Sequence, residues 1–116
     1  MEAKQEYTLL RIFMASIDKV ESHPLYEAIV FAAKKKGMAG ATVFKGIMGF
    51  GASSLIHTSK IFELTDDVPI IVEIVDKPDK IEAFIEDIEP MIQQSKLGGL
   101  ISTEKINAII YKGHQK

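Results

Sequence analysis

Four segments of the chain are rich in apolar residues that occupy one or both of the alternating faces of a strand, and in two others apolar residues recur every three to four residues. The first four, residues 7–15, 41–48, 68–76 and 101–112, are predicted strands, and residues 24–36 and 77–97 are predicted helices. The order is β-α-β, a connection over residues 49–67, then β-α-β again. Two such halves of similar length predict a ferredoxin-like α+β fold: an antiparallel sheet with both helices on one face.

The ends of the helices are marked by residues with known positional preferences. Pro24 is expected at the first helical position, and Gly37 directly after the last turn, where residues 34–36 are lysines that complement the helix dipole. Pro90 is expected to kink the second helix because it removes one backbone donor. The core-facing residues predicted by the helical spacing are Leu25, Ala28, Ile29, Ala32 and Ala33, then Ile81, Phe84, Ile85, Ile88 and Ile92.

The first predicted strand is apolar on both faces, apart from Arg11. Such a strand lies at the centre of a sheet that is covered on both sides. Since the helices cover one face, a second copy of the chain is expected on the other. Arg11 then serves either an inter-subunit salt bridge or a phosphate clamp. Glu73, in an otherwise apolar strand, is expected at a solvent or interface position paired with a lysine, in preference to a buried catalytic carboxylate.

The composition narrows the class of protein. A chain of 116 residues with 26% charged residues fits one domain, residues 1–116, with a frayed tail over 113–116. The absence of cysteine excludes disulfide scaffolds, cysteine zinc sites and thiol catalysis. With a net charge of −2 and one arginine among fourteen basic residues, a nucleic-acid partner is not expected. The apolar runs are too short for membrane insertion and the first residues lack a secretory h-region, so we expect a cytoplasmic protein.

Glycines cluster before and within the long connection. Five of the eight lie between Gly37 and Gly51, and amides in such a segment can form an anion-binding nest. The neighbouring donors for an anion are Lys45, Ser53, Ser54 and, at the other end of the chain, Lys112. The alternative is that these glycines only allow turns. Residues 46–51 have the spacing of a phosphate-binding P-loop, but Ala52 occupies the position of the required lysine.

His57 offers a second kind of chemistry within the same connection. With Ser53 or Ser54 it could form the nucleophile pair of a small hydrolase, although no acidic residue stands out to orient it. A metal site on His57 is disfavoured because no second ligand follows at the usual spacing. We therefore expect no enzymatic activity, and keep the hydrolase and a structural or metal-binding trimer as alternatives.

A linked set of motifs resembles one family over nearly the whole chain. The motifs are residues 24–28 (Pro-Leu-Tyr-Glu-Ala), 40–43 (Gly-Ala-Thr-Val), 49–54 (Gly-Phe-Gly-Ala-Ser-Ser), 56–58 (Ile-His-Thr) and 72–76 (Val-Glu-Ile-Val-Asp). They look like the uncharacterised PII-like family of small bacterial and archaeal proteins, which is related to the nitrogen-regulatory PII proteins.

The resemblance implies a homotrimer with a signalling role. In PII proteins, ATP or ADP binds between subunits at the base of a T-loop, and the loop contacts a protein target; residues 49–67 match this loop. The residues that match the loop base are Gly49, Phe50, Gly51 and Ala52, and Lys45 and Gly46 lie just before it. With the candidate anion contacts Arg11, Ser53, Ser54 and Lys112, they make up the expected effector-binding set. The chain departs from PII in three ways: the Gly-Asp-Gly-Lys run is not found, only Lys112 stands near the two C-terminal arginines, and residues 49–67 hold no tyrosine for uridylylation.

Overall fold

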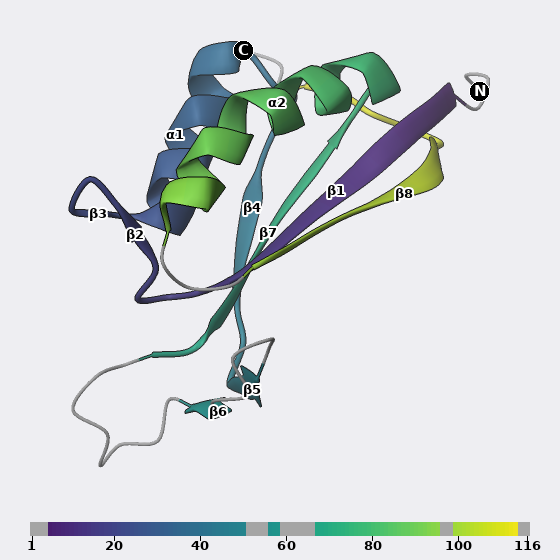
Figure 1. Cartoon of the computed structure of the whole chain (residues 1–116). Coiled ribbons are helices and arrows are strands. Elements are labelled where there is room, and N and C mark those ends of the chain that lie inside the picture. The colour runs from purple at the N-terminus through teal and green to yellow at the C-terminus, as the bar shows by residue number, and fades with distance from the viewer. Residues whose placement is uncertain (1–4, 51–55, 59–66, 96–98, 114–116) are drawn as a thin grey trace.

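A four-stranded antiparallel sheet and two helices on one of its faces make up the body of the molecule (Figure 1). The computed structural model describes residues 5–50, 56–58, 67–95 and 99–113. The main strands are β1 (Gln5–Ala15), β4 (Thr42–Lys45), β7 (Pro69–Asp76) and β8 (Leu100–Ala108), and the helices are α1 (Leu25–Lys36) and α2 (Pro78–Gln94). The strand order β4-β7-β1-β8 confirms the predicted ferredoxin-like α+β fold.

Strand β1 lies between β7 and β8 and sets the register of the sheet. Leu10 is opposite Ile74 on β7 and Thr103 on β8, so these three side chains point to the same face. Along β7 every second residue is buried, beginning with Ile70. The buried set faces the helices, and the alternate set lies on the opposite face, which we call the open face.

The core fills the space between the sheet and the two helices. Its buried side chains are Leu10, Ile12 and Met14 from β1, Ile70, Val72 and Ile74 from β7, Leu25, Ile29 and Ala33 from α1, and Ile81, Phe84 and Ile88 from α2. The helical residues are the ones that the spacing predicts. Each large apolar side chain removed from water contributes about 1.5–3 kcal/mol to folding.

The ends of the helices follow the predictions with two corrections, one of which is that α2 ends at Gln94, three residues before the predicted end at residue 97. Gly37 ends α1 with φ 82°, a left-handed conformation that glycine adopts without a steric penalty. Pro90 lies inside α2, which continues to Gln94. The prediction for Pro24 was wrong by one residue: Pro24 precedes the helix, because it pairs with Lys19 in a short hairpin.

That hairpin, formed by β2 (Lys19–Val20) and β3 (His23–Pro24), has no counterpart in the sequence prediction. Its turn consists of Glu21 and Ser22, both with positive φ, at 48° and 70°. Two-residue turns of this kind favour Asn-Gly, so the sequence carries no signal for this turn.

Two predicted strands are shorter than expected. Strand β4 ends at Lys45, three residues early, and β8 ends at Ala108, four residues early. Ala108 pairs with Gln5, the first residue of β1, and beyond it Tyr111 stacks on Tyr7 with ring centroids 5.9 Å apart. The chain therefore leaves the sheet edge and crosses the end of β1.

The long connection contains its own antiparallel ribbon. Strands β5 (Met48–Phe50) and β6 (Ile56–Thr58) pair, with Gly49 opposite His57. The expectation of an irregular connection beginning at residue 49 is corrected to this extent. We refer to β5 and β6 as the arm; it lies beyond the end of the main sheet, away from the helices (Figure 1).

Candidate functional site

The base of the arm is the place where most of the described candidate residues gather. Lys45 ends β4, and the Gly46 N–H then donates a hydrogen bond to the Pro69 carbonyl oxygen, 2.8 Å away. This bond extends the pairing of β4 with β7 to the point where the chain turns into the arm. The Gly46 amide is therefore engaged with backbone in this structure, and an anion at this place would contact other donors.

Two glycines at the base are required by close packing on the Pro69 ring. A Cβ atom on Gly46 would lie 3.2 Å from the Pro69 Cβ, and one on Gly49 would lie 3.1 Å from the Pro69 Cγ. Both distances are shorter than ordinary carbon–carbon contacts, so a side chain at either position would displace the proline or the arm. The glycines thus allow the chain to pass close to the Pro69 ring where the arm leaves the sheet.

Large apolar side chains on this part of the chain face solvent. Ile47 is 82% exposed and Phe50 is 72% exposed, and Met48 between them is also exposed. A contiguous group of exposed apolar residues at the tip of a protein is typical of a contact surface.

Arg11 lies on the open face, in the middle of the sheet, and is paired within its own chain. Its Nε donates to Glu73 Oε2 at 3.0 Å, and its Nη1 donates to Glu104 Oε1 at 3.2 Å. The hydrogen bond from Arg11 to Glu73 is the main reason that the pKa of Arg11 is raised. Glu73 is thus paired with Arg11 in place of the expected lysine, in a network of one guanidinium and two carboxylates within one subunit. An inter-subunit salt bridge of Arg11 stays a prediction.

Lys112 lies at the other end of the molecule. It follows Tyr111, which packs on Tyr7 and close to Gly40, where the Tyr111 hydroxyl is 3.6 Å from the position of an added Cβ. Lys45 pairs with Ile70 and so lies level with Met14 of β1, whereas the strand leading to Lys112 ends level with Gln5. These two levels are about 30 Å apart at roughly 3.3 Å per residue.

The predicted set is therefore divided in a single chain among the arm base, the middle of the open face and the far end of the sheet. Four further members, Gly51, Ala52, Ser53 and Ser54, lie outside the described residues. His57 is placed by its backbone in β6. The hydrolase alternative, which needs Ser53 or Ser54 beside His57, stays a prediction.

The open face is mostly apolar around the Arg11 network. Register places on it Tyr7, Leu9 and Phe13 of β1, Ile71 and Val75 of β7, Phe44 of β4, and Leu100 and Ile106 of β8. Phe44 and Leu100 are among the exposed large hydrophobic residues. Within the described chain, no helix covers this face (Figure 1).

Two buried carboxylates were not singled out from the sequence, and both organise chain connections. Asp76 is 4% exposed; its Oδ2 accepts from the Ala39 N–H at 2.9 Å and its Oδ1 from the Lys77 N–H at 2.8 Å. It joins the end of β7 to the segment that follows α1. Asp18 Oδ2 accepts from the Ala15 N–H at 3.0 Å. An Asp at the end of an apolar strand, followed by Lys-Pro, is the only sequence signal for the first of these.

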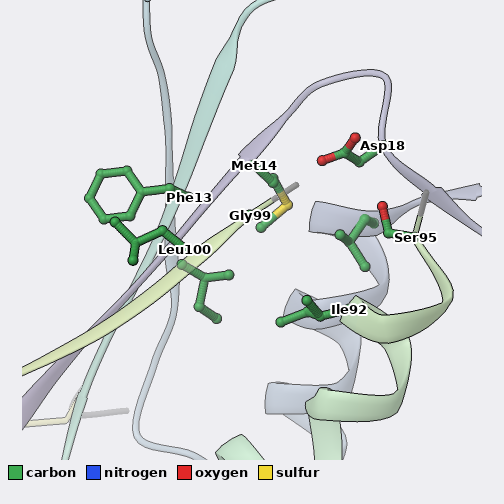
Figure 2. Close-up of a pocket in the computed structure, with 9 residues that line it drawn as sticks. Phe13, Met14, Asp18, Ile92, Ser95, Gly99 and Leu100 are labelled. Atoms are coloured by element: carbon green, nitrogen blue, oxygen red, sulfur yellow. The ribbon is translucent and has the colours of Figure 1, made fainter. Parts of the chain in front are cut away.

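A small cavity lies where the end of β1 meets the end of α2 and the start of β8 (Figure 2). Met14 and Ile92 supply apolar walls, while Asp18 and Ser95 supply polar atoms. The space is about 10 Å³, which is room for one water molecule and not for an organic effector. An effector site in this protein must lie elsewhere.

Within the described ranges, no three His, Asp or Glu side chains are grouped closely enough to hold a metal ion. Among the described helices, none combines the length and the apolar character needed to cross a membrane.

Comparisons with known proteins agree with this architecture. The family model of DUF190, described as "Uncharacterized ACR, COG1993", matches residues 7–108. A UPF0166 protein of Aquifex aeolicus is 39% identical over 101 residues, which cover 87% of this chain and 91% of the relative.

Solved structures with the same fold are PII-like. CPII, a nitrogen regulatory PII-like protein from Thiomonas intermedia K12 bound to ADP, AMP and bicarbonate, matches with a TM-score of 0.70 at 14% identity, covering 91% of both chains. A PII-like signaling protein from Thermus thermophilus matches with a TM-score of 0.66 at 14% identity, over 93% of this chain and 94% of that one. The chain therefore belongs to the DUF190 family, an uncharacterised family with a PII-like fold.

Proposed function

We propose that this protein is a PII-like regulatory protein that binds an adenine nucleotide, ADP or ATP, between the subunits of a homotrimer. Binding changes the connection over residues 49–67, and a protein partner reads that change. The observation that carries the proposal is the division of the candidate residues: Lys45 and Lys112 lie at opposite ends of one sheet, so only neighbouring subunits can bring them to one ligand.

Support for the trimer comes from the open face. A sheet face lined by Leu9, Phe13 and Ile71 loses free energy when it stays in water, at about 25 cal/mol for each Å² of apolar surface. The Arg11 network in its middle is satisfied within one subunit, so association need not supply a partner for a buried charge.

Support for the nucleotide comes from the chemistry at the arm base and from the fold. Phe50 presents an exposed ring on which a base can stack, and the Lys45 ammonium can contact a phosphate. CPII, which shares the fold, is crystallised with ADP and AMP.

Regulation requires that the nucleotide bind one arrangement of the connection better than another, since a ligand that binds both equally does not change their populations. Gly46 and Gly49 are the described residues through which a ligand at the arm base would act. Their close contact with Pro69 ties the position of the arm to strand β7.

Isothermal titration with ADP and with ATP tests the proposal. We expect saturable heat at sub-millimolar nucleotide, and an affinity about tenfold weaker after Lys45→Ala or Phe50→Ala, because each removes one ligand contact. Lys19→Ala, an exposed lysine on β2, is the matched control and should bind normally. The absence of heat with both nucleotides would overturn the nucleotide assignment.

A further inference from the structure

A groove on the helix layer is not used by the proposed function. It lies between the β2–β3 hairpin, the start of α1 and the end of α2, and its volume is about 360 Å³, within the range of small-molecule sites. It is lined by Val20, Glu21, His23, Glu27, Ala28, Phe31, Pro90, Met91 and Gln94. Because the helices lie on the face opposite the open face, association through the open face leaves this groove accessible.

The carboxylates that line the groove give it a negative charge. Two lining residues, Glu21 and Glu27, carry carboxylates, and none of the lining residues is a lysine or an arginine. The last turn of α2, which supplies Gln94, also has no basic residue, so it adds no positive side chain to the groove. The groove therefore attracts a cation and repels an anion.

The walls of the groove are apolar and include an aromatic ring. Phe31 is 66% exposed, an unusual position for phenylalanine on a helix that buries its other face. Val20 and Met91 continue the apolar surface. An aromatic face beside carboxylates is the arrangement that binds organic cations, because the ring quadrupole attracts positive charge while the ring also covers an apolar stem.

The backbone that carries Glu21 is strained. Glu21 and its neighbour Ser22 both have positive φ, which residues with a side chain adopt rarely. Both values are those that a two-residue hairpin turn requires, so the turn fixes the position of residue 21. Here it brings Glu21 to the wall of the groove.

We propose that this groove binds a small organic cation: an ammonium or guanidinium group on a short apolar stem. The charged group lies between Glu21 and Glu27 and against the ring of Phe31, and the stem contacts Val20 and Met91. The site is separate from the arm base, so it stands whether or not a nucleotide binds there.

The test uses ¹⁵N-labelled full-length protein and hexylammonium chloride as the probe, followed by amide chemical shifts. We expect saturable shifts at residues 20–23, 25–31 and 91–94. Sodium hexanoate and hexanol, at matched ionic strength, keep the stem and remove the positive charge, so both should give little or no shift. ADP added to the same sample reports on the arm base and separates a failure here from a failure of the proposed function.

Three variants assign the interaction to side chains. Glu21→Gln and Glu27→Gln should each weaken hexylammonium binding about threefold to fivefold, as expected for one partly exposed ion pair. Phe31→Leu, which keeps an apolar surface without the ring, should weaken it by a similar factor. Glu6→Gln removes one carboxylate at the start of β1 and should leave binding unchanged.

Selective binding of the cation, weakened by both glutamine variants and not by Glu6→Gln, supports the proposal. It is overturned if hexanol shifts the same amides as strongly, if both glutamine variants bind like the unsubstituted protein, or if hexylammonium produces no shift. The reference spectrum of each variant shows whether it is folded before any titration begins.

Discussion

The two faces of the sheet are built from the same strands and differ in what covers them. Leu10 is fully buried against the helices, and its neighbour Leu9 points to the open face and stays partly exposed. The helix face is apolar along the whole core, whereas the open face sets one arginine and two glutamates among its apolar residues. Folding alone buries the helix face, whereas the open face has the composition of a surface that is buried by association.

The largest effects are expected when the same charge is placed on each face of the sheet in turn, which tests the difference between the two faces. Leu10→Asp puts a carboxylate without a partner into the core, at a cost of more than about 4 kcal/mol, and should prevent folding. Leu9→Asp should leave a folded subunit and abolish association. Circular dichroism reports folding, and light scattering reports mass.

Light scattering on the unsubstituted protein supplies the reference. We expect about three times the subunit mass of 12.9 kDa. A single subunit mass at micromolar concentration, or a Leu9→Asp variant that keeps the full assembled mass, would contradict the role assigned to the open face.

A smaller effect is expected at the arm base, where the comparison is between two glycines. Gly49→Ala brings a Cβ within 3.1 Å of the Pro69 Cγ and should cost about 1 kcal/mol of folding free energy, measured by urea unfolding. Gly113→Ala meets no atom within 4 Å and is the control, with a change below about 0.5 kcal/mol.

The double variant Gly49→Ala with Pro69→Ala removes the ring against which the new methyl group packs. We expect it to recover part of the loss, because the two substitutions act on one contact and are not additive. Strict additivity would show that the proline ring is not what makes glycine necessary at position 49.

The smallest effect concerns Tyr111, which covers one end of the open face by stacking on Tyr7. Burial raises the pKa of Tyr111 above 10.0, with smaller contributions from the charges of Asp76 and Tyr7. The folded state then holds this proton more tightly than the unfolded state. The stability that it contributes is complete below pH 10 and is lost as the pH rises through the folded pKa.

Tyr111→Phe should therefore flatten the decline of the unfolding free energy between about pH 9 and pH 11. Urea unfolding at several pH values measures this slope. Tyr26→Phe, at a tyrosine on α1, serves as the control and should show the same decline of the unfolding free energy as the unsubstituted protein. An unchanged slope in Tyr111→Phe would show that the hydroxyl is equally hydrated in both states.

The elements that could be predicted are those with a strong period. The spacing of Ile81, Phe84 and Ile88 predicts the buried face of α2, and the continuous apolar run after Pro69 predicts β7. The β2–β3 hairpin could not be predicted, because Glu21 and Ser22 adopt a turn that their residue types disfavour. The end of β8 at Ala108 could not be predicted, because apolar residues continue to Tyr111 in the sequence.

The candidate site was predicted less well than the fold, for a related reason. Arg11 and Glu73 each stand out in the sequence as a charge within an apolar strand, but their pairing follows from register. Glu104, which completes the network, lies diagonally opposite on a third strand. Whether Lys45 and Lys112 cooperate depends on how subunits meet, which a single chain leaves undetermined.

The junction between β7 and α2 has a mechanical consequence. Strand β7 runs without interruption from Pro69, beside the arm, to Asp76, and only Lys77 separates it from the helix. The Asp76 carboxylate also accepts hydrogen bonds from the Lys77 and Ala39 N–H groups, so this end of the strand is fixed to the start of α2 and to the segment after α1. Because β7 is also paired with β1 and β4, the start of α2 and the segment after α1 keep fixed positions relative to the sheet.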